Sequence, residues 1–298
     1  MFLSGRVRIA GAITATAAIV TGLALVLASS ATPPARAAAS ATLEPATSPP
    51  ASPPSANGSP PCVQQLSQHG DDRLLVVIGA SFTAGVGPGN PDRSWAAVLA
   101  RMLRWNAIVY GVPGAGYVRS GASRKGPVTT EMARIDLSAL HPSLVIVQAG
   151  HDDIGVPARL EERRVARTIA LIRAEAPGAR IALVTVFPGR ASLAAAHRTD
   201  QAIVAGATAA DPGLIIMDPL TAHWRYQRSA DGLHPTVAGS DWLAGQVAGV
   251  LRGHGMGAVR ATDPMFCDYN SPGKHSRIRV PPPAAASART DPPWLSAT

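Results

Sequence analysis

The stretch LLVVIGASFTAG at residues 74–85 decides how this chain of 298 residues folds. Its first five residues are aliphatic without alternation, which is typical of a parallel strand buried on both faces of a sheet. The glycines on either side of Ser81 permit a tight turn, and a helix N-terminus beyond such a turn would favour negative charge at the serine. The stretch therefore predicts a central strand that ends in an exposed serine hydroxyl.

Strand and helix signals alternate along the rest of the middle of the chain. Short apolar runs predict further strands at 107–110, 144–147, 181–187 and 214–217. Periodic stretches predict helices at 92–104, with Asp92 or Ser94 as N-cap, and at 158–176, 192–210 and 236–251. Such alternation favours a parallel sheet with helices on both faces. We therefore expect an α/β fold, a three-layer α/β/α sandwich with a parallel sheet of about five strands.

The composition divides the chain into four parts. Residues 1–37 contain Arg6 and Arg8 near their start, continue as an uncharged apolar stretch and end in Ala-Arg-Ala. This pattern indicates either a cleaved signal peptide or an uncleaved N-terminal anchor. Residues 38–61 form a Pro/Ala/Ser-rich linker, 62–254 the folded domain, and 255–298 a Pro-rich C-terminal tail. We expect a secreted or envelope-associated, extracytoplasmic protein that meets the membrane only through an uncleaved N-terminal segment.

The basic charge of the chain does not indicate a nucleic-acid partner. The formal net charge is +8, but about half of this excess lies outside residues 62–254, and no basic run of five residues occurs. Aromatic residues are scarce, at 4%, and are not interleaved with the basic ones. We expect a solvated basic surface, with attraction to an anionic cell envelope as the alternative.

The chain has two cysteines, Cys62 and Cys267, which flank the expected domain. In an exported protein such a pair is a disulfide candidate, and the alternative is two free thiols. A disulfide would tie the first part of the tail to the domain. Two cysteines alone do not make a zinc site, and we expect neither a metal nor a cofactor.

Three polar motifs lie where strands of the expected sheet end or the last helix begins. Ser81 follows the first strand, Gly150–Asp153 follows the strand at 144–147, and Asp231 and His234 precede the last helix. Ligands of parallel sheets bind at the carboxyl ends of the strands. A carboxylate three residues from an imidazole can hold it as a general base, although each motif alone is also an ordinary turn. The Gly-x-Ser-x-Gly elbow of α/β-hydrolases is absent.

Taken together and in this order, the motifs resemble the blocks of the SGNH hydrolases, also called GDSL esterases and lipases, of the secreted bacterial type. The resemblance covers about residues 74–251. It implies that Ser81 is the nucleophile, His234 the base and Asp231 the acid that orients it. It also implies an oxyanion hole with the N–H groups of Ser81 and Gly114. Such enzymes hydrolyse esters of short acyl groups, lipids or acetylated glycans through an acyl-enzyme, without a metal.

Two residues depart from the family pattern. Ala80 stands where the family usually has a largely structural Asp, and Asp152 stands where it has the Asn that completes the oxyanion hole. An ionised carboxylate only accepts hydrogen bonds and would repel an oxyanion. Losing one such donor typically costs about 10²–10³ in rate. Asp152 would still donate if it stayed protonated, which the neighbouring Asp153 would favour.

Because Asp152 departs from the family pattern, functions other than ester hydrolysis are also considered. An acyltransferase acting on envelope glycan or lipid would use an alcohol in place of water, and a catalytically silent domain would only bind envelope carbohydrate. A metal site at 151–153 is disfavoured because three adjacent residues rarely converge on one ion. Trp224 and Tyr226 would either wall the substrate pocket or pack under the loop that carries Asp231. We expect a monomer whose partner is an ester substrate.

Overall fold

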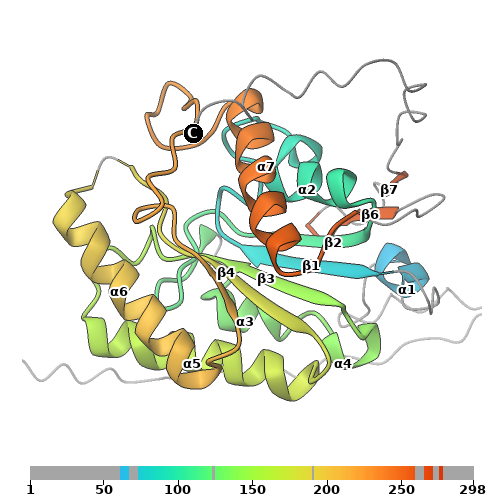
Figure 1. The fold of residues 1–298 in the computed structure, drawn as a ribbon, viewed down its shortest axis with the longest axis horizontal. Coiled ribbons are helices and arrows are strands. Elements are labelled where there is room, and N and C mark those ends of the chain that lie inside the picture. The colour runs from blue at the N-terminus through green and yellow to red at the C-terminus, as the bar shows by residue number, and fades with distance from the viewer. Residues whose placement is uncertain are drawn as a thin grey trace, which may run out of the picture. The chain divides into compact units, whose positions relative to one another are not determined.

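The apolar runs form a parallel sheet at the centre of the molecule (Figure 1). Its strands run in the order β5-β4-β3-β1-β2-β6-β7, and all neighbours are parallel except β6 and β7. The strands are β1 (Leu74–Gly79), β2 (Asn106–Gly111), β3 (Leu144–Gln148), β4 (Arg180–Val184), β5 (Ile215–Met217), β6 (Met265–Asp268) and β7 (His275–Arg277). The α/β class expected from the sequence is confirmed.

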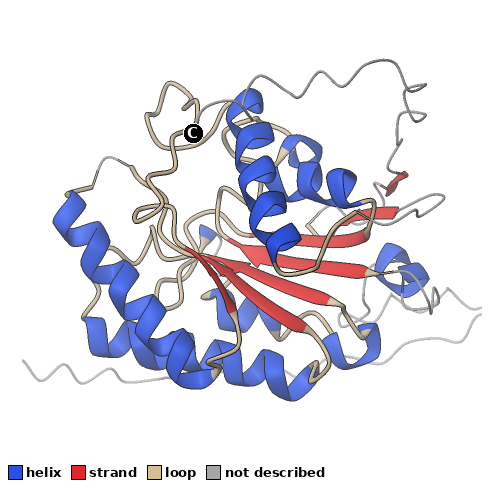
Figure 2. Cartoon of the chain, in the orientation of Figure 1, coloured by secondary structure: helices blue, strands red, loops and turns tan. Residues whose placement is uncertain are grey.

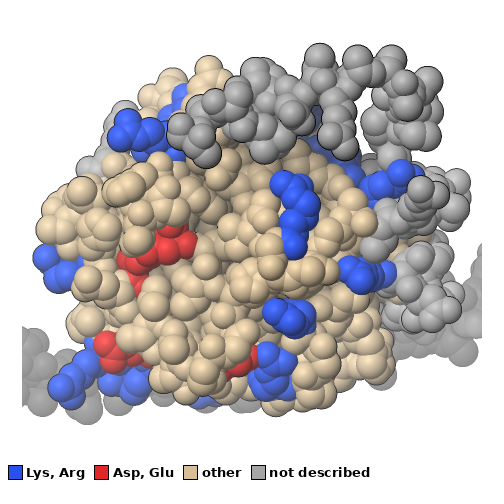
Figure 3. All heavy atoms as spheres, in the orientation of Figure 1, with Lys and Arg blue, Asp and Glu red and all other residues tan. Residues whose placement is uncertain are grey.

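This computed structural model describes residues 61–66, 73–122, 125–189, 191–258, 265–270 and 275–277. The expected export segment at 1–37 and all but the last residue of the expected linker lie outside these ranges, so both stay predictions. Among the described residues, no helix is long and apolar enough to cross a membrane. On the face shown in Figure 3, Lys and Arg side chains lie scattered among uncharged residues.

Helices cover both faces of the sheet (Figure 2). On one face lie α2 (Trp95–Leu103) and α7 (Val237–Gly253). On the other lie α3 (Val128–Met132), α4 (Leu137–Leu140), α5 (Ala158–Glu175) and α6 (Leu193–Ala210). Successive β1 side chains alternate between the two cores: Leu75 and Val77 face α2 and α7, whereas Val76 and Ile78 face the other layer. This double burial explains the unbroken apolar run.

The helix expected at 92–104 is present as α2, and a series of turns separates it from Ser81. Residues 81–89 form successive turns, a short 3-10 helix η1 (Pro91–Arg93) follows, and α2 begins only at Trp95. Glycines with positive φ at positions 85 and 89, together with two prolines, prevent a continuous helix. Of the two expected N-caps of α2, Ser94 takes the role and accepts a hydrogen bond from Ala97 N at 3.3 Å.

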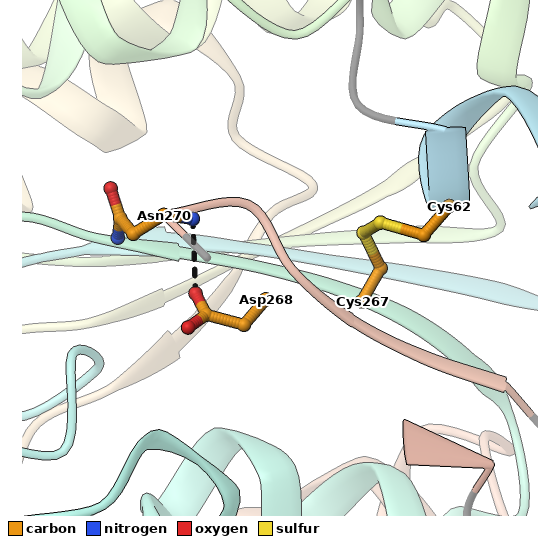
Figure 4. The surroundings of a disulfide bond; sticks show 4 residues. All are labelled: Cys62, Cys267, Asp268 and Asn270. Atoms are coloured by element: carbon orange, nitrogen blue, oxygen red, sulfur yellow. Dashed lines mark hydrogen bonds between the residues drawn. A yellow bond between two sulfur atoms is a disulfide. The ribbon is translucent and has the colours of Figure 1, made fainter. Parts of the chain in front are cut away.

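The sheet has one parallel strand more than the roughly five expected. The additional strand is β6, which pairs with β2 and lies in the segment assigned to the C-terminal tail. The predicted disulfide is present, and it joins Cys267 of β6 to Cys62 of α1 (Pro61–Leu66), as Figure 4 shows. A four-residue strand in Pro-rich surroundings gives little local signal, because its pairing with β2 is long-range.

Candidate active site

Ser81 lies at the carboxyl end of β1, in a turn that is fixed to the neighbouring strand β3. Ala80 N donates to the carbonyl of Gln148 at 3.1 Å, and the Thr83 hydroxyl donates to the Gln148 side chain at 2.9 Å. A Cβ at Gly79 would lie 2.5 Å from Thr83 Oγ1 and 2.6 Å from Gln148 O, so only glycine fits there. The turn therefore holds the serine at a defined position at the carboxyl end of the central strand β1.

The structure brings Ser81, His234 and Asp231 into one hydrogen-bonded chain. His234 Nε2 lies 2.7 Å from Ser81 Oγ, and His234 Nδ1 lies 2.6 Å from Asp231 Oδ2. Asp231 also accepts from the Ser229 hydroxyl and from the backbone N–H groups of Leu233 and His234. The hydrogen bond from His234, followed by that from Leu233, holds the pKa of Asp231 well below its usual range.

An ionised Asp231 decides which ring nitrogen of His234 carries the proton. A carboxylate only accepts hydrogen bonds, so Nδ1 must be the donor. Nε2 of the neutral imidazole is then an acceptor that faces the Ser81 hydroxyl at 2.7 Å. This is the arrangement that general-base activation of a serine requires.

The loop that follows Ser81 also contacts the loop that carries His234. A Cβ at Gly87 would lie 2.0 Å from the Pro235 carbonyl oxygen and 2.8 Å from His234 Cβ. Gly87 is therefore a site residue that sequence reasoning missed. The sequence shows that this position is a glycine, but only the folded structure shows that it lies against Pro235 and His234.

Gly114 lies in the loop after β2, with φ at +79°. In the described part of the chain, the backbone N–H groups of Ser81 and Gly114 make no hydrogen bond. Unpaired N–H groups at a catalytic serine are donors available to a ligand oxygen. Both residues that the sequence assigned to backbone donation thus have free donors.

Asp152 lies after β3 and is half-buried. Its carboxyl makes no hydrogen bond to any residue that the structure describes. Burial is the main cause that raises its pKa above the usual aspartate value; the charge of His151 opposes this and that of Asp153 adds to it. The pKa of Asp152 is therefore raised, as expected, but the main cause is burial and not the charge of Asp153. The charges of His234 and Arg119 also lower the pKa of Asp152, which places Asp152 near His234.

Asp153 is a structural link between two loops of the site. Its buried carboxylate accepts from the backbone N–H groups of Tyr117 and Arg119, at 2.5 and 2.9 Å. A Cβ at Gly116 would lie 2.1 Å from Asp153 Oδ2. Beneath it, burial and the Asp153 charge raise the pKa of Glu161 to about 9. The Gly114 loop is thus held onto the loop that carries Asp152.

The side chains of the His151–Asp153 motif diverge. His151 Nδ1 lies 3.3 Å from the Phe187 carbonyl oxygen, and burial lowers the pKa of His151, which favours the neutral ring. Asp153 turns to backbone N–H groups, as described above. Among the residues with described positions, no three His, Cys, Asp or Glu side chains gather as metal ligands would. That the protein needs no metal stays a prediction.

The two aromatic residues before Asp231 lie in different surroundings. Tyr226 is buried, and its hydroxyl lies within hydrogen-bonding distance of the Pro188 and Leu233 carbonyl oxygens, at 3.2 and 2.9 Å. It therefore supports the loop that carries His234. Trp224 packs edge-on against Trp242 and lines a cavity of about 270 Å³. Of the two, Trp224 borders space that a ligand could fill.

Comparison with known proteins connects this geometry to a family. The model of the GDSL-like lipase/acylhydrolase family matches residues 77–242, more than half of the chain. A GDSL lipase of Mycobacterium tuberculosis is 29% identical in an alignment of 188 residues that covers 59% of this chain and 80% of that protein.

Solved structures share the fold. A carbohydrate acetylesterase from Sinorhizobium meliloti is similar with a TM-score of 0.51 and 13% identity, over 61% of this chain and 99% of that one. An inhibitor-bound aryl esterase of M. smegmatis gives a TM-score of 0.50 and 15% identity, over 61% and 99%. A family two carbohydrate esterase from Clostridium thermocellum gives 0.50 and 17%, over 62% and 65%. At these identities the likeness shows the fold alone.

Proposed function

This chain belongs to the GDSL-like lipase/acylhydrolase family and is a serine ester hydrolase, and we propose that Ser81, His234 and Asp231 are its catalytic triad. One observation carries the proposal: the unbroken chain of hydrogen bonds from Ser81 Oγ through the imidazole to the Asp231 carboxylate, at 2.7 and 2.6 Å. Each member then has a group within the distance that proton transfer needs.

The reaction has two halves. His234 Nε2 takes the Ser81 proton while Oγ forms a bond to the ester carbonyl carbon, and the carbonyl oxygen becomes an oxyanion. The bond to the leaving oxygen then breaks, and His234 gives its proton to the departing alcohol. In the second half, a water loses its proton to His234, attacks the acyl-enzyme and releases the acid with Ser81 protonated again. Asp231 stays ionised throughout and stabilises the imidazolium.

We propose that the oxyanion is held by the N–H groups of Ser81 and Gly114 and by a protonated Asp152. The two backbone groups are free of other hydrogen bonds within the described residues. The burial that raises the Asp152 pKa supports the protonated form, which donates where an ionised carboxylate would repel. Because Asp152 is a neutral donor only below its pKa, the enzyme loses this contribution as the pH rises.

The substrate class we propose is an ester of a short acyl group, including acetylated glycans, with lipid esters as the alternative. The names of the similar proteins, a lipase and several carbohydrate esterases, support this range. The cavity lined by Trp224 is the proposed place for part of the substrate. We also propose an extracytoplasmic location, which the Cys62–Cys267 disulfide supports because such bonds persist in oxidising compartments.

Labelling with a fluorophosphonate probe tests the proposed triad. The probe should modify the unmutated full-length protein, and Ser81→Ala should abolish labelling together with hydrolysis of short-chain nitrophenyl esters. Ser138→Ala, which changes an exposed serine of α4, is the matched control and should label normally. An unmutated protein that does not label, or a Ser81→Ala variant that labels as well as the control, would overturn the assignment.

A further inference from the structure

Strand β6 lies outside the residues matched by the family model, yet it leads to the oxyanion side of the site. It runs parallel to β2, with Asp268 beside Val109, and Tyr269 N donates to the Val109 carbonyl at 3.0 Å. The chain beyond β6 therefore continues along the end of β2, where Gly111 leads into the loop of Gly114. Figure 4 shows Asn270 just past the strand whose Cys267 forms the disulfide.

The side chain of Asn270 bridges two segments. Its Nδ2 donates to the Gly111 carbonyl oxygen at 2.7 Å, and its Oδ1 accepts from Lys125 Nζ at 3.3 Å. Its own backbone N–H donates to Asp268 Oδ1 at 3.1 Å, which fixes the turn after β6. Both ends of one amide are therefore used, each on a different segment.

The first of these segments, at Gly111, has no room to move toward the nucleophile. A Cβ at Gly111 would lie 2.3 Å from Ala84 N and 2.7 Å from the Thr83 carbonyl carbon. Next to it, Val112 N donates to the Gly79 carbonyl at 2.8 Å. The Asn270 amide thus holds a peptide that is already in contact with the loop of the catalytic serine.

The second segment, which Asn270 contacts at Lys125, is hydrogen-bonded to the Gly114 loop. Ala122 N donates to the Pro113 carbonyl at 2.7 Å, and Lys125 N donates to the Ala122 carbonyl at 3.4 Å. A Cβ at Gly114 would have Ala122 N and Gly121 Cα as its nearest neighbours, each at 3.8 Å. Contacts from Asn270 therefore reach both flanks of the free Gly114 N–H.

We propose that Asn270 is a positioning residue for the oxyanion hole, and that the Cys62–Cys267 disulfide holds the strand that carries it. The proposal rests on the proposed function, because it takes the Gly114 N–H as an oxyanion donor. Asparagine suits the position because its amide donates and accepts at once. An aspartate would keep the contact to Lys125, but would place a carboxylate against the Gly111 carbonyl oxygen.

The test compares Asn270→Asp with Tyr269→Phe. The control removes the hydrogen bond of the neighbouring Tyr269 hydroxyl to the Arg134 carbonyl, at 2.6 Å, and keeps the ring contact with Tyr110. Asn270→Asp should lower kcat for a nitrophenyl ester about tenfold, less than the roughly 10²–10³ of a deleted oxyanion donor, with KM within about twofold. Inhibition by an alkyl boronic acid, which forms a tetrahedral adduct on serine, should weaken by the same factor.

Tyr269→Phe should leave kcat, KM and boronic acid inhibition unchanged. The proposal is overturned if Asn270→Asp leaves kcat intact, if it raises only KM, or if the control lowers kcat equally. Fluorophosphonate labelling separates this from failure of the proposed function. An unmutated protein that neither labels nor hydrolyses esters contradicts the triad, whereas an active protein with an equally active Asn270→Asp variant contradicts only the role of Asn270.

The disulfide is tested by a double-mutant cycle. Replacing Cys62 and Cys267 by serine should lower kcat about as much as Asn270→Asp does, and adding Asn270→Asp to that background should cost less than about twofold more. A full additional tenfold loss would show that the disulfide does not act through Asn270. If the serine variant does not fold, the comparison of Asn270→Asp with Tyr269→Phe decides the role of Asn270 by itself.

Discussion

On one side of Ser81 a single turn of four residues carries both the proposed base and the proposed acid, whereas on the other side the proposed oxyanion donors come from separate loops. Asp231 and His234 are joined by side-chain and backbone hydrogen bonds within that turn. Gly114 and Asp152 follow different strands, and hydrogen bonds of Asp153 link their two loops. The base side is a local structure, and the donor side is an assembled one.

This difference teaches where the protein can vary. In the local turn, a change at one residue acts on both proposed catalytic groups, because Asp231 and His234 are hydrogen-bonded to each other. An assembled set of donors can lose or gain one member and keep the chemistry at another rate. The departure of Asp152 from the family pattern falls on the assembled side, as this contrast would lead one to expect.

The largest loss of activity should follow from a substitution in the turn that carries Asp231 and His234. Asp231→Asn keeps the shape but offers an amide that can donate to Nδ1, which stabilises the wrong tautomer of His234. We expect kcat for nitrophenyl esters to fall about 10³–10⁴-fold. Asp241→Asn, on the surface of α7, is the control and should keep full activity. An Asp231→Asn variant within about threefold of the unmutated enzyme would contradict the assignment of the acid.

Gly87→Ala should break the contact between the nucleophile loop and the base. The added methyl would overlap the Pro235 carbonyl and His234 Cβ, so the loops must separate. A displacement of about 1 Å in a catalytic group can cost about 10² in rate. Steady-state kinetics would measure the loss, with Gly178→Ala as control because a Cβ there meets nothing within 4 Å. Equal activity of both variants would show that the loops tolerate the separation.

Asp152→Asn tests the donor side, because the asparagine amide is a hydrogen-bond donor at every pH. In the unmutated enzyme, the proposed Asp152 donor is lost once its carboxyl ionises, so kcat should fall as the pH rises through the raised pKa of Asp152. The amide has no such ionisation, and the variant should stay active there, with a gain of about 10- to 100-fold at the highest pH. Profiles of kcat from pH 5 to 9 measure both. Parallel profiles would mean that Asp152 does not act as a protonated donor.

The smallest effect concerns the buried carboxyls under the donor side. The Glu161 pKa is raised from 4.5 to about 9, so the folded protein holds this proton more tightly than the unfolded chain. The resulting stabilisation is complete below about pH 4.5 and is lost as the pH rises toward 9. Glu161→Gln, which cannot ionise, should match the unmutated unfolding temperature at pH 5 and exceed it by a few degrees at pH 9. Curves that stay parallel across this range would contradict the buried proton.

Sequence patterns could predict the structures that are local. The apolar runs gave β1 to β5 within a few residues, because double burial leaves an unbroken aliphatic signal. The residues now joined around Ser81 were recognisable because each follows a strand or precedes a helix. The roles of Gly87 and Asn270 were not predictable, because each depends on a contact with a segment far away in the chain.

The same physical reason explains the missed strand. Met265–Asp268 has too few residues for a periodic signal, and its partner β2 lies more than 150 residues earlier. The sequence indicated for Asp153 a charge beside Asp152 and a disfavoured metal ligand, whereas its main contacts are backbone N–H groups of another loop. The sequence shows that such residues are present, but it does not show which distant residues they contact.

The pairing of β6 with β2 also covers an edge of β2 that would otherwise be open to other chains. Without β6, the backbone N–H and C=O groups along one side of β2 would form an exposed edge of buried-type residues, a template for pairing with a strand of another molecule. The disulfide fastens the short strand that covers this edge. Reduction of this bond would therefore remove one of the links that keep the edge of β2 covered.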